Sequence, residues 1–220
     1  MEIFQGFPLL ENGDCMPDDE FLRRYEQMPG VKAELIDGVV YMASPVSAEL
    51  HGMPHNDLQH ALSHYRIFMS KVRATDNSTV KLGKKNIPQP DIGLFINSPE
   101  GQARIVDGYL VGAPELVAEI SASTRSVDVN QKFETYQKAG VKEYLVWRVE
   151  DDEIDWWQLV NGKYERLRED DAGVIRSVVY PGLWLNVPEL ISANMPAVLA
   201  TIDAGRNTPE YKSFAAVHSG

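Results

Sequence analysis

The chain has 220 residues with a formal net charge of −11, and it contains a single cysteine, Cys15. A chain of this length can bury a core without disulfides, and one cysteine excludes both a disulfide framework and a Cys-based zinc site. The negative charge argues against broad, non-specific nucleic-acid binding, which Lys and Arg side chains drive. No apolar run approaches the ~20 residues of a membrane span, and the first residues lack the basic start of a secretory signal. We therefore expect no membrane association and a reducing, cytoplasmic location.

The first part of the chain predicts a short helix, a hairpin and a longer helix. Residues 17–28 carry acidic side chains in the first turn, as helices commonly do. In residues 34–43, Asp37-Gly38 separates two apolar runs and supplies the positive φ angles of a type I′ hairpin turn. Residues 53–70 place apolar side chains at helical spacing.

Strand signals dominate the rest of the chain, so the expected fold class is α/β. A helix at 128–139 between strands 116–120 and 143–149 predicts a βαβ unit with a right-handed crossover. One domain over residues 1–202 is the most economical organisation, and the small, polar residues 203–220 predict a loose C-terminal tail. The other predicted strands cover residues 91–96, 103–106, 109–111, 154–160 and 163–167.

Two acidic residues stand at the ends of predicted strands. Asp91 opens the strand after Pro90, and Glu119 lies near the end of the strand at 116–120. Two carboxylates on adjacent strands can share a Mg²⁺ ion, which prefers oxygen ligands and keeps several waters. Such an ion polarises a phosphoryl oxygen and lowers the pKa of a bound water. From these residues alone the signal is weak, because acids at strand ends are common, and a turn-capping Asp and a solvated Glu are the favoured interpretation.

Several short motifs change that balance because of their order along the chain. In this order they resemble the Uma-type restriction endonucleases, a branch of the PD-(D/E)XK nuclease superfamily, from about Phe21 to Trp184. The motifs are Glu34-Leu-Ile-Asp37-Gly38, Ser44-Pro45, His51, Pro90-Asp91, Leu116-Val-Ala-Glu119-Ile-Ser-Ala-Ser123-Thr124-Arg125, Asp128 to Lys132, and Tyr136-Gln-Lys-Ala139-Gly140-Val-Lys-Glu143-Tyr144.

The resemblance implies a restriction-endonuclease-like mixed β-sheet flanked by helices, with additional β-hairpins. It also implies a hydrolase that cleaves DNA phosphodiester bonds with Mg²⁺ or Mn²⁺, and a homodimer is plausible because cutting both strands needs two sites. Asp91 and Glu119 would hold the metal, with the backbone carbonyl of Ile120 as a further ligand. The superfamily pattern places a lysine where this chain has Ser121, and Lys132 on the following helix would substitute for it.

Other residues are candidates for supporting roles. Glu34 would supply a third carboxylate, or instead pair with Lys32 or cap the hairpin, and His51 would lie near the active centre. A locally basic segment just before Asp91 would contact DNA, and Arg125 would contact phosphate or form a surface salt bridge. The lysines predicted to contact DNA in that segment are Lys81, Lys84 and Lys85.

Two functions remain open at this point. The nearly complete set of acids and lysine favours a metal-dependent endonuclease acting on DNA. The absence of a lysine at position 121 and the acidity of the chain favour a catalytically inactive nuclease-fold protein that binds a partner.

Overall fold

A six-stranded mixed β-sheet forms the centre of the computed structural model, which describes residues 3–4, 7–122 and 127–220. Its strand order is β13-β12-β11-β10-β7-β5. Strands β10 and β11 are parallel, and the other neighbouring pairs are antiparallel. The bounds are β5 Val72–Asp76, β7 Ile92–Ile96, β10 Leu116–Ser121, β11 Glu143–Arg148, β12 Glu153–Val160 and β13 Lys163–Arg166.

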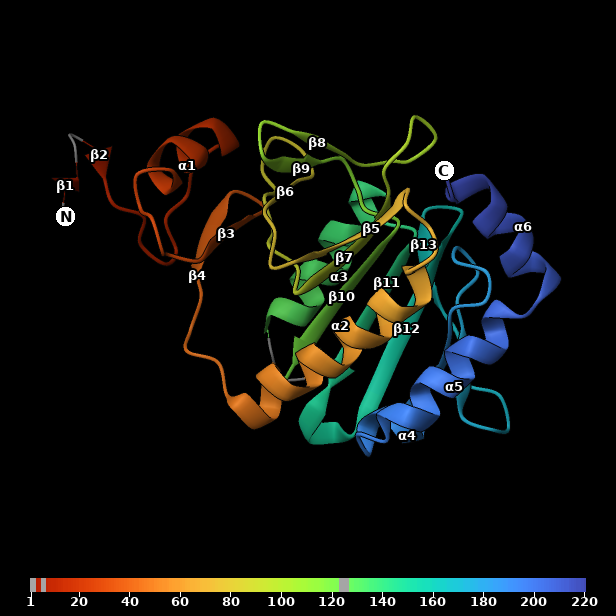
Figure 1. The fold of residues 1–220 in the computed structure, drawn as a ribbon. Helices are drawn as coiled ribbons and strands as arrows, with labels where there is room; N and C mark the ends of the chain where they lie inside the picture. Colours follow the sequence, from red (N-terminus) through yellow and green to blue (C-terminus); the bar gives the residue numbers. More distant parts are fainter. Residues whose placement is uncertain (1–2, 5–6, 123–126) are drawn as a thin grey trace.

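Helices cover both faces of this sheet, with α2 in front of it and α3 behind it in Figure 1. Side chains alternate along β10, so Leu116, Ala118 and Ile120 join the core on the α2 side. Val117 packs on the opposite side with Tyr136 of α3. The helices are α2 Met53–Arg66, α3 Val127–Ala139, α4 Val187–Ile191, α5 Met195–Arg206 and α6 Pro209–His218. This arrangement confirms the predicted mixed sheet flanked by helices.

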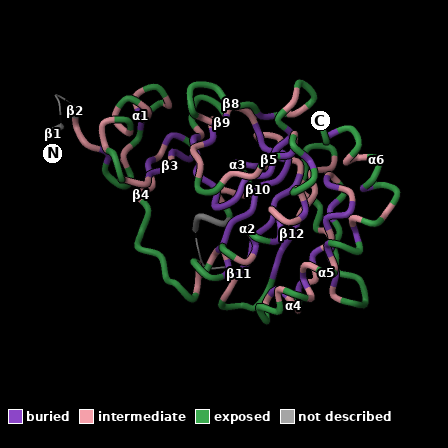
Figure 2. The backbone as a smooth tube through the Cα atoms, in the orientation of Figure 1, coloured by how far each residue is buried: buried purple, intermediate pink, exposed green. Residues whose placement is uncertain are grey.

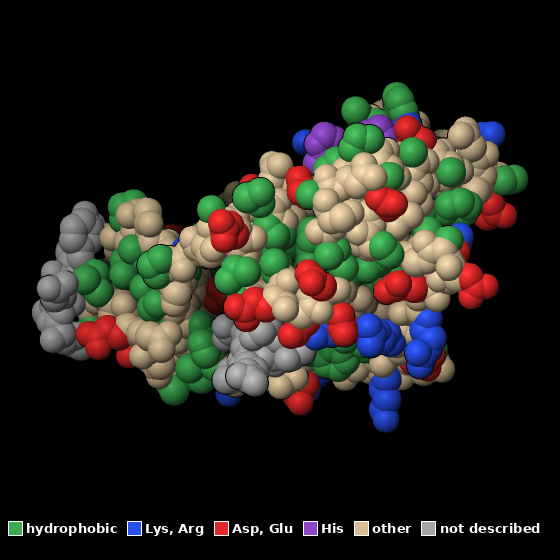
Figure 3. Space-filling view, turned by 90° about the horizontal axis from the view of Figure 1, so that it is seen from below, with side chains coloured by type: hydrophobic (Ala, Val, Ile, Leu, Met, Phe, Trp, Pro, Cys, Tyr) green, Lys and Arg blue, Asp and Glu red, His purple; other side chains and the backbone are tan. Residues whose placement is uncertain are grey.

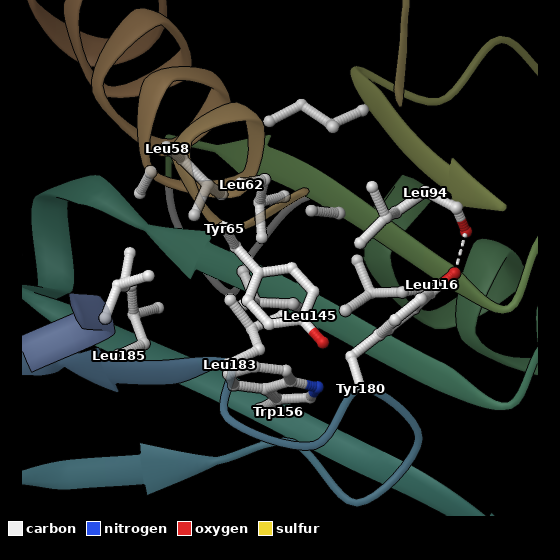
Figure 4. Packing of buried hydrophobic residues seen from close by; sticks show 14 of the residues in the cluster. Leu58, Leu62, Tyr65, Leu94, Leu116, Leu145, Trp156, Tyr180, Leu183 and Leu185 are labelled. Atoms are coloured by element: carbon white, nitrogen blue, oxygen red, sulfur yellow. Dashed lines mark hydrogen bonds between the residues drawn. The ribbon is translucent and has the colours of Figure 1, made fainter. Parts of the chain in front are cut away.

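Figure 2 shows the central strands coloured as buried, and consecutive residues of β10 and β11 are buried, so both faces of these strands are covered. That explains why β10 and β11 read as nearly continuous apolar runs rather than alternating ones. In the core on the α2 side, the Tyr180 hydroxyl donates a 3.0 Å hydrogen bond to the carbonyl oxygen of Leu94. Figure 4 shows this bond beside Tyr65 and Trp156, so the sheet and the segment that carries Tyr180 share one core.

Short elements surround this central unit. The predicted hairpin is confirmed as β3 and β4, and its turn has φ of 50° at Asp37 and 83° at Gly38, as a type I′ turn requires. The remaining elements are β1 Ile3–Phe4, β2 Phe7–Pro8, α1 Asp18–Tyr25, β3 Ala33–Ile36, β4 Val39–Met42, η1 Ala48–Gly52, β6 Val80–Lys81, β8 Arg104–Val106, β9 Tyr109–Val111, η2 Val149–Asp151, β14 Val174–Arg176 and β15 Trp184–Asn186.

The C-terminal segment corrects the sequence prediction, because residues 203–220 are not a loose tail. They contain the end of α5 and all of α6, whose Tyr211 is buried and makes an edge-on ring contact with Tyr65 of α2. Thr208 caps α6 by accepting a hydrogen bond from the Tyr211 amide at 3.2 Å. The capping Thr208-Pro209 pair was the signal for this helix, and the small, polar composition concealed it.

Candidate functional site

The two predicted metal-binding acids lie side by side at one end of the sheet. Strands β7 and β10 are antiparallel, with Ile92 paired to Ala118. Continuing this register by one residue places Asp91 beside Glu119. Both side chains line one cavity of about 610 Å³. Seen from below, the molecule is hollowed between its N-terminal part and its body, and acidic side chains show in the hollow (Figure 3).

Asp91 is held from two sides. Its Oδ2 accepts a 2.8 Å hydrogen bond from the backbone amide of Ile120, and its Oδ1 lies 3.2 Å from Nε2 of His51. Lys32 Nζ lies 3.9 Å from the same Oδ1. Burial alone would raise the pKa of Asp91, but the hydrogen bonds from His51 and Ile120 outweigh it and lower that pKa. Asp91 is therefore an ionised carboxylate in a fixed orientation.

Glu119 is buried, and its Oε1 accepts two hydrogen bonds. The Tyr136 hydroxyl donates one at 2.7 Å, and Lys132 Nζ donates the other at 3.1 Å. Burial raises the pKa of Glu119 to about 7; the Lys132 charge opposes this rise and the Asp91 charge adds to it. Neither of these two contacts uses Oε2 of Glu119.

Lys132 joins the helix α3 to the site. Its Nζ lies 3.0 Å from Oε2 of Glu34 as well as 3.1 Å from Glu119. Burial alone would lower the pKa of Lys132, but the two carboxylates outweigh it and raise that pKa, so the ammonium stays charged. Oε1 of Glu34 accepts a 2.6 Å hydrogen bond from the backbone amide of Gln89. Glu34 thus pairs with Lys132, whereas the sequence had left open a pairing with Lys32.

The oxygen donors of this site fit a hydrated Mg²⁺ or Mn²⁺ ion. Within the described ranges, no group of three or more His, Cys, Asp or Glu side chains is arranged to hold a metal. Mg²⁺ does not need such a cage, because it is commonly bound through one or two carboxylates and keeps several waters. Asp91 and Glu119 would supply the carboxylates, and the Ile120 carbonyl would be the further ligand. The amide of Ile120 already fixes Asp91 against this part of β10.

The lysines that were predicted to contact DNA lie away from this cavity. Lys81 ends β6 and places its Nζ 3.9 Å from the centre of the Tyr109 ring. Lys84 and Lys85 are exposed in the turn that follows. None of the three lines the cavity, whose lysines are Lys32 and Lys132. The predicted contact at Arg125 lies outside the described residues.

Sequence reasoning did not place two residues, Lys32 and His55, beside the acids. Lys32 was considered only as a partner of Glu34, although it reaches Asp91. His55 was not placed at the site, and its Nε2 lies 3.1 Å from the carbonyl oxygen of Asp91. The signal for His55 was its position four residues after His51, one helical turn along the chain.

The chain belongs to the Uma2 family, whose model is described as "Putative restriction endonuclease" and matches residues 18–188. The fold is also similar to a crystal structure of "a putative nuclease belonging to DUF820" from Anabaena variabilis. The two are 19% identical with a TM-score of 0.62, and the match covers 78% of this chain and 97% of the other. No curated protein matches this chain. Of the described helices, none combines the length and apolar character that crossing a membrane requires.

Proposed function

We propose that this chain is a metal-dependent endonuclease that hydrolyses DNA phosphodiester bonds. The observation that carries the proposal is that Asp91 and Glu119, from adjacent strands, line one cavity with Lys132 of α3. The family description of restriction endonucleases supports the same reaction class.

In this proposal, the residues of the site have different roles in phosphodiester hydrolysis. Mg²⁺ or Mn²⁺, bound by Asp91, Glu119 and the Ile120 carbonyl, would polarise a phosphoryl oxygen and provide an acidified water. His51 and the Ile120 amide hold Asp91 in position for this binding. The Lys132 ammonium orients the attacking water or stabilises the negative charge that develops on the phosphoryl group. In-line attack of the water would form a new P–O bond as the bond from phosphorus to the 3′ or 5′ oxygen breaks, with the water's proton passing to solvent and the leaving oxygen taking up a proton from solvent.

Cleavage assays with matched Mg²⁺ titrations test this proposal. Wild-type protein should cut DNA only when the divalent ion is present. The variants Asp91→Asn and Glu119→Gln should keep the fold and lose cleavage, because they remove the charge that holds the ion but little volume. Full cleavage by both variants would contradict the assignment of Asp91 and Glu119 as metal ligands.

A catalytically inactive, partner-binding nuclease fold is the second candidate. The observation that favours it is Ser121 at the motif position, together with a Lys132 ammonium already engaged by two carboxylates. This candidate expects wild-type protein to leave DNA intact at every Mg²⁺ and Mn²⁺ concentration. A homodimer belongs to the endonuclease candidate, since cutting both strands needs two sites, and light scattering with and without DNA tests it.

A further inference from the structure

The hydroxyl of Tyr144 is buried and has no hydrogen-bond partner among the residues that the structure describes. Burying a hydroxyl without a partner costs free energy, and buried polar groups in native proteins are nearly always hydrogen-bonded. Of the described side chains with such an orphaned atom, Tyr144 is the one that lines the cavity of the candidate site. This points to a partner that the chain itself does not supply.

Tyr144 lines the same cavity as the two acids. Tyr144 lies on β11 opposite Val117 of β10, so both side chains point to the α3 face of the sheet. Glu119, two residues after Val117, points to the same face. The centre of the Tyr144 ring is 5.1 Å from that of Tyr136, whose hydroxyl is bonded to Glu119. The missing partner is therefore a group that occupies the cavity beside Glu119.

We propose that Tyr144 is a positioning residue whose hydroxyl donates a hydrogen bond to a water molecule that enters with the divalent ion. This inference rests on the proposed function. The Tyr144 side chain is 0% exposed, so water does not reach its hydroxyl in the metal-free protein, and the partner that enters with the ion must be small enough to need only a slight opening of the cavity wall. A single water is the smallest such partner. Mg²⁺ and Mn²⁺ retain waters when two carboxylates bind them, and outer hydrogen-bond partners fix the ligands of a metal site.

The substitution Tyr144→Phe removes the hydroxyl alone, and it should separate stability from metal binding. Because the hydroxyl is unpaired without the ion, the melting temperature of metal-free protein should not fall. The Kd for Mn²⁺, measured by calorimetry on the full chain, should rise about tenfold, and the cleavage rate should drop by a similar factor.

Tyr164→Phe is the matched control, because Tyr164 stacks on Tyr144 and its hydroxyl donates to the Val141 carbonyl at 3.0 Å. Losing that bond should lower the melting temperature by about 2–4 °C and leave Mn²⁺ binding and cleavage unchanged.

Three results would overturn the inference, and they differ in what else they affect. If Tyr144→Phe melts lower without metal, as the control does, and binds Mn²⁺ as wild type does, the hydroxyl serves a resident structural partner. If wild type binds Mn²⁺ and cleaves, but Tyr144→Phe does both equally well, only this inference falls. If wild type binds no Mn²⁺, the proposed function falls together with it.

Discussion

Lys132 Nζ lies 3.1 Å from Oε1 of Glu119, although the two residues are thirteen positions apart in the chain. The helix α3 follows β10 and returns antiparallel to it, so its first turns lie near the end of β10 that carries Glu119. A lysine near the start of α3 can therefore occupy the space that a lysine at position 121 would reach from the strand.

We predict that Lys132→Met lowers the cleavage rate about 10²-fold or more, the usual range for a group that positions or transfers protons. The affinity for the divalent ion should not fall, because the substitution removes a positive charge that lies beside Glu34 and Glu119. The melting temperature should drop, since removing one partner of a buried ion pair leaves uncompensated charge. Single-turnover cleavage and Mn²⁺ calorimetry, both run below the melting temperature of the variant, measure the cleavage rate and the metal affinity. Thermal denaturation measures the change in melting temperature.

Lys138→Met is the matched control on the same helix. Lys138 pairs with Glu134 at 2.9 Å, but both side chains are 64% exposed. It should cleave, bind metal and melt as wild type does. If Lys132→Met also cleaves at the wild-type rate, Lys132 has no catalytic part and the inactive, partner-binding candidate gains.

The reach of Lys132 was predictable from helix geometry, whereas the approach of the β3–β4 hairpin was not. Leu35 pairs with Ile87, and this bridge brings Lys32 and Glu34 to the site. Such a tertiary contact between distant segments leaves no local pattern in the sequence. The basic run before Asp91 is also divided by the tertiary structure: Arg73 lies on β5 and Lys81 on β6, and these strands belong to different sheets.

A triple Lys81→Ala, Lys84→Ala, Lys85→Ala variant tests whether that segment still contacts DNA outside the cavity. We expect wild-type binding to be weak and steeply salt-dependent, with a plot of log affinity against log salt that is shallower by about 3 in the variant. Fluorescence anisotropy at several salt concentrations measures this slope. The single variant Lys32→Ala, inside the cavity, is the comparison. A triple variant that binds as wild type does would remove these lysines from the DNA interface.

The ion pair between His51 and Asp91 predicts a pH effect in metal-free protein. The hydrogen bond to Asp91 is the main cause that raises the pKa of His51 above 6.5. A raised pKa means that this pair stabilises the fold fully below pH 6.5 and that the contribution is lost as pH rises through the raised value. NMR titration should place the His51 pKa above 6.5, and in Asp91→Asn it should move back down. A His51 pKa unchanged by Asp91→Asn would contradict the pairing.

The C-terminal helix predicts a stability effect that a loose tail would not have. Tyr211→Ala should lower the free energy of unfolding by about 3–5 kcal/mol, as expected for a large aromatic side chain removed from a core. Lys212→Ala, at the exposed neighbouring position, should change it by less than about 0.5 kcal/mol. Urea denaturation of both variants measures the difference. Equal stability of the two would mean that α6 does not contribute to the core.

Anomalous diffraction from a crystal soaked in Mn²⁺ tests the metal site most directly. The account predicts an anomalous peak within coordination distance of carboxylate oxygens of both Asp91 and Glu119, and the loss of that peak in Asp91→Asn crystals. A fully soaked wild-type crystal with no peak between these two residues would contradict it.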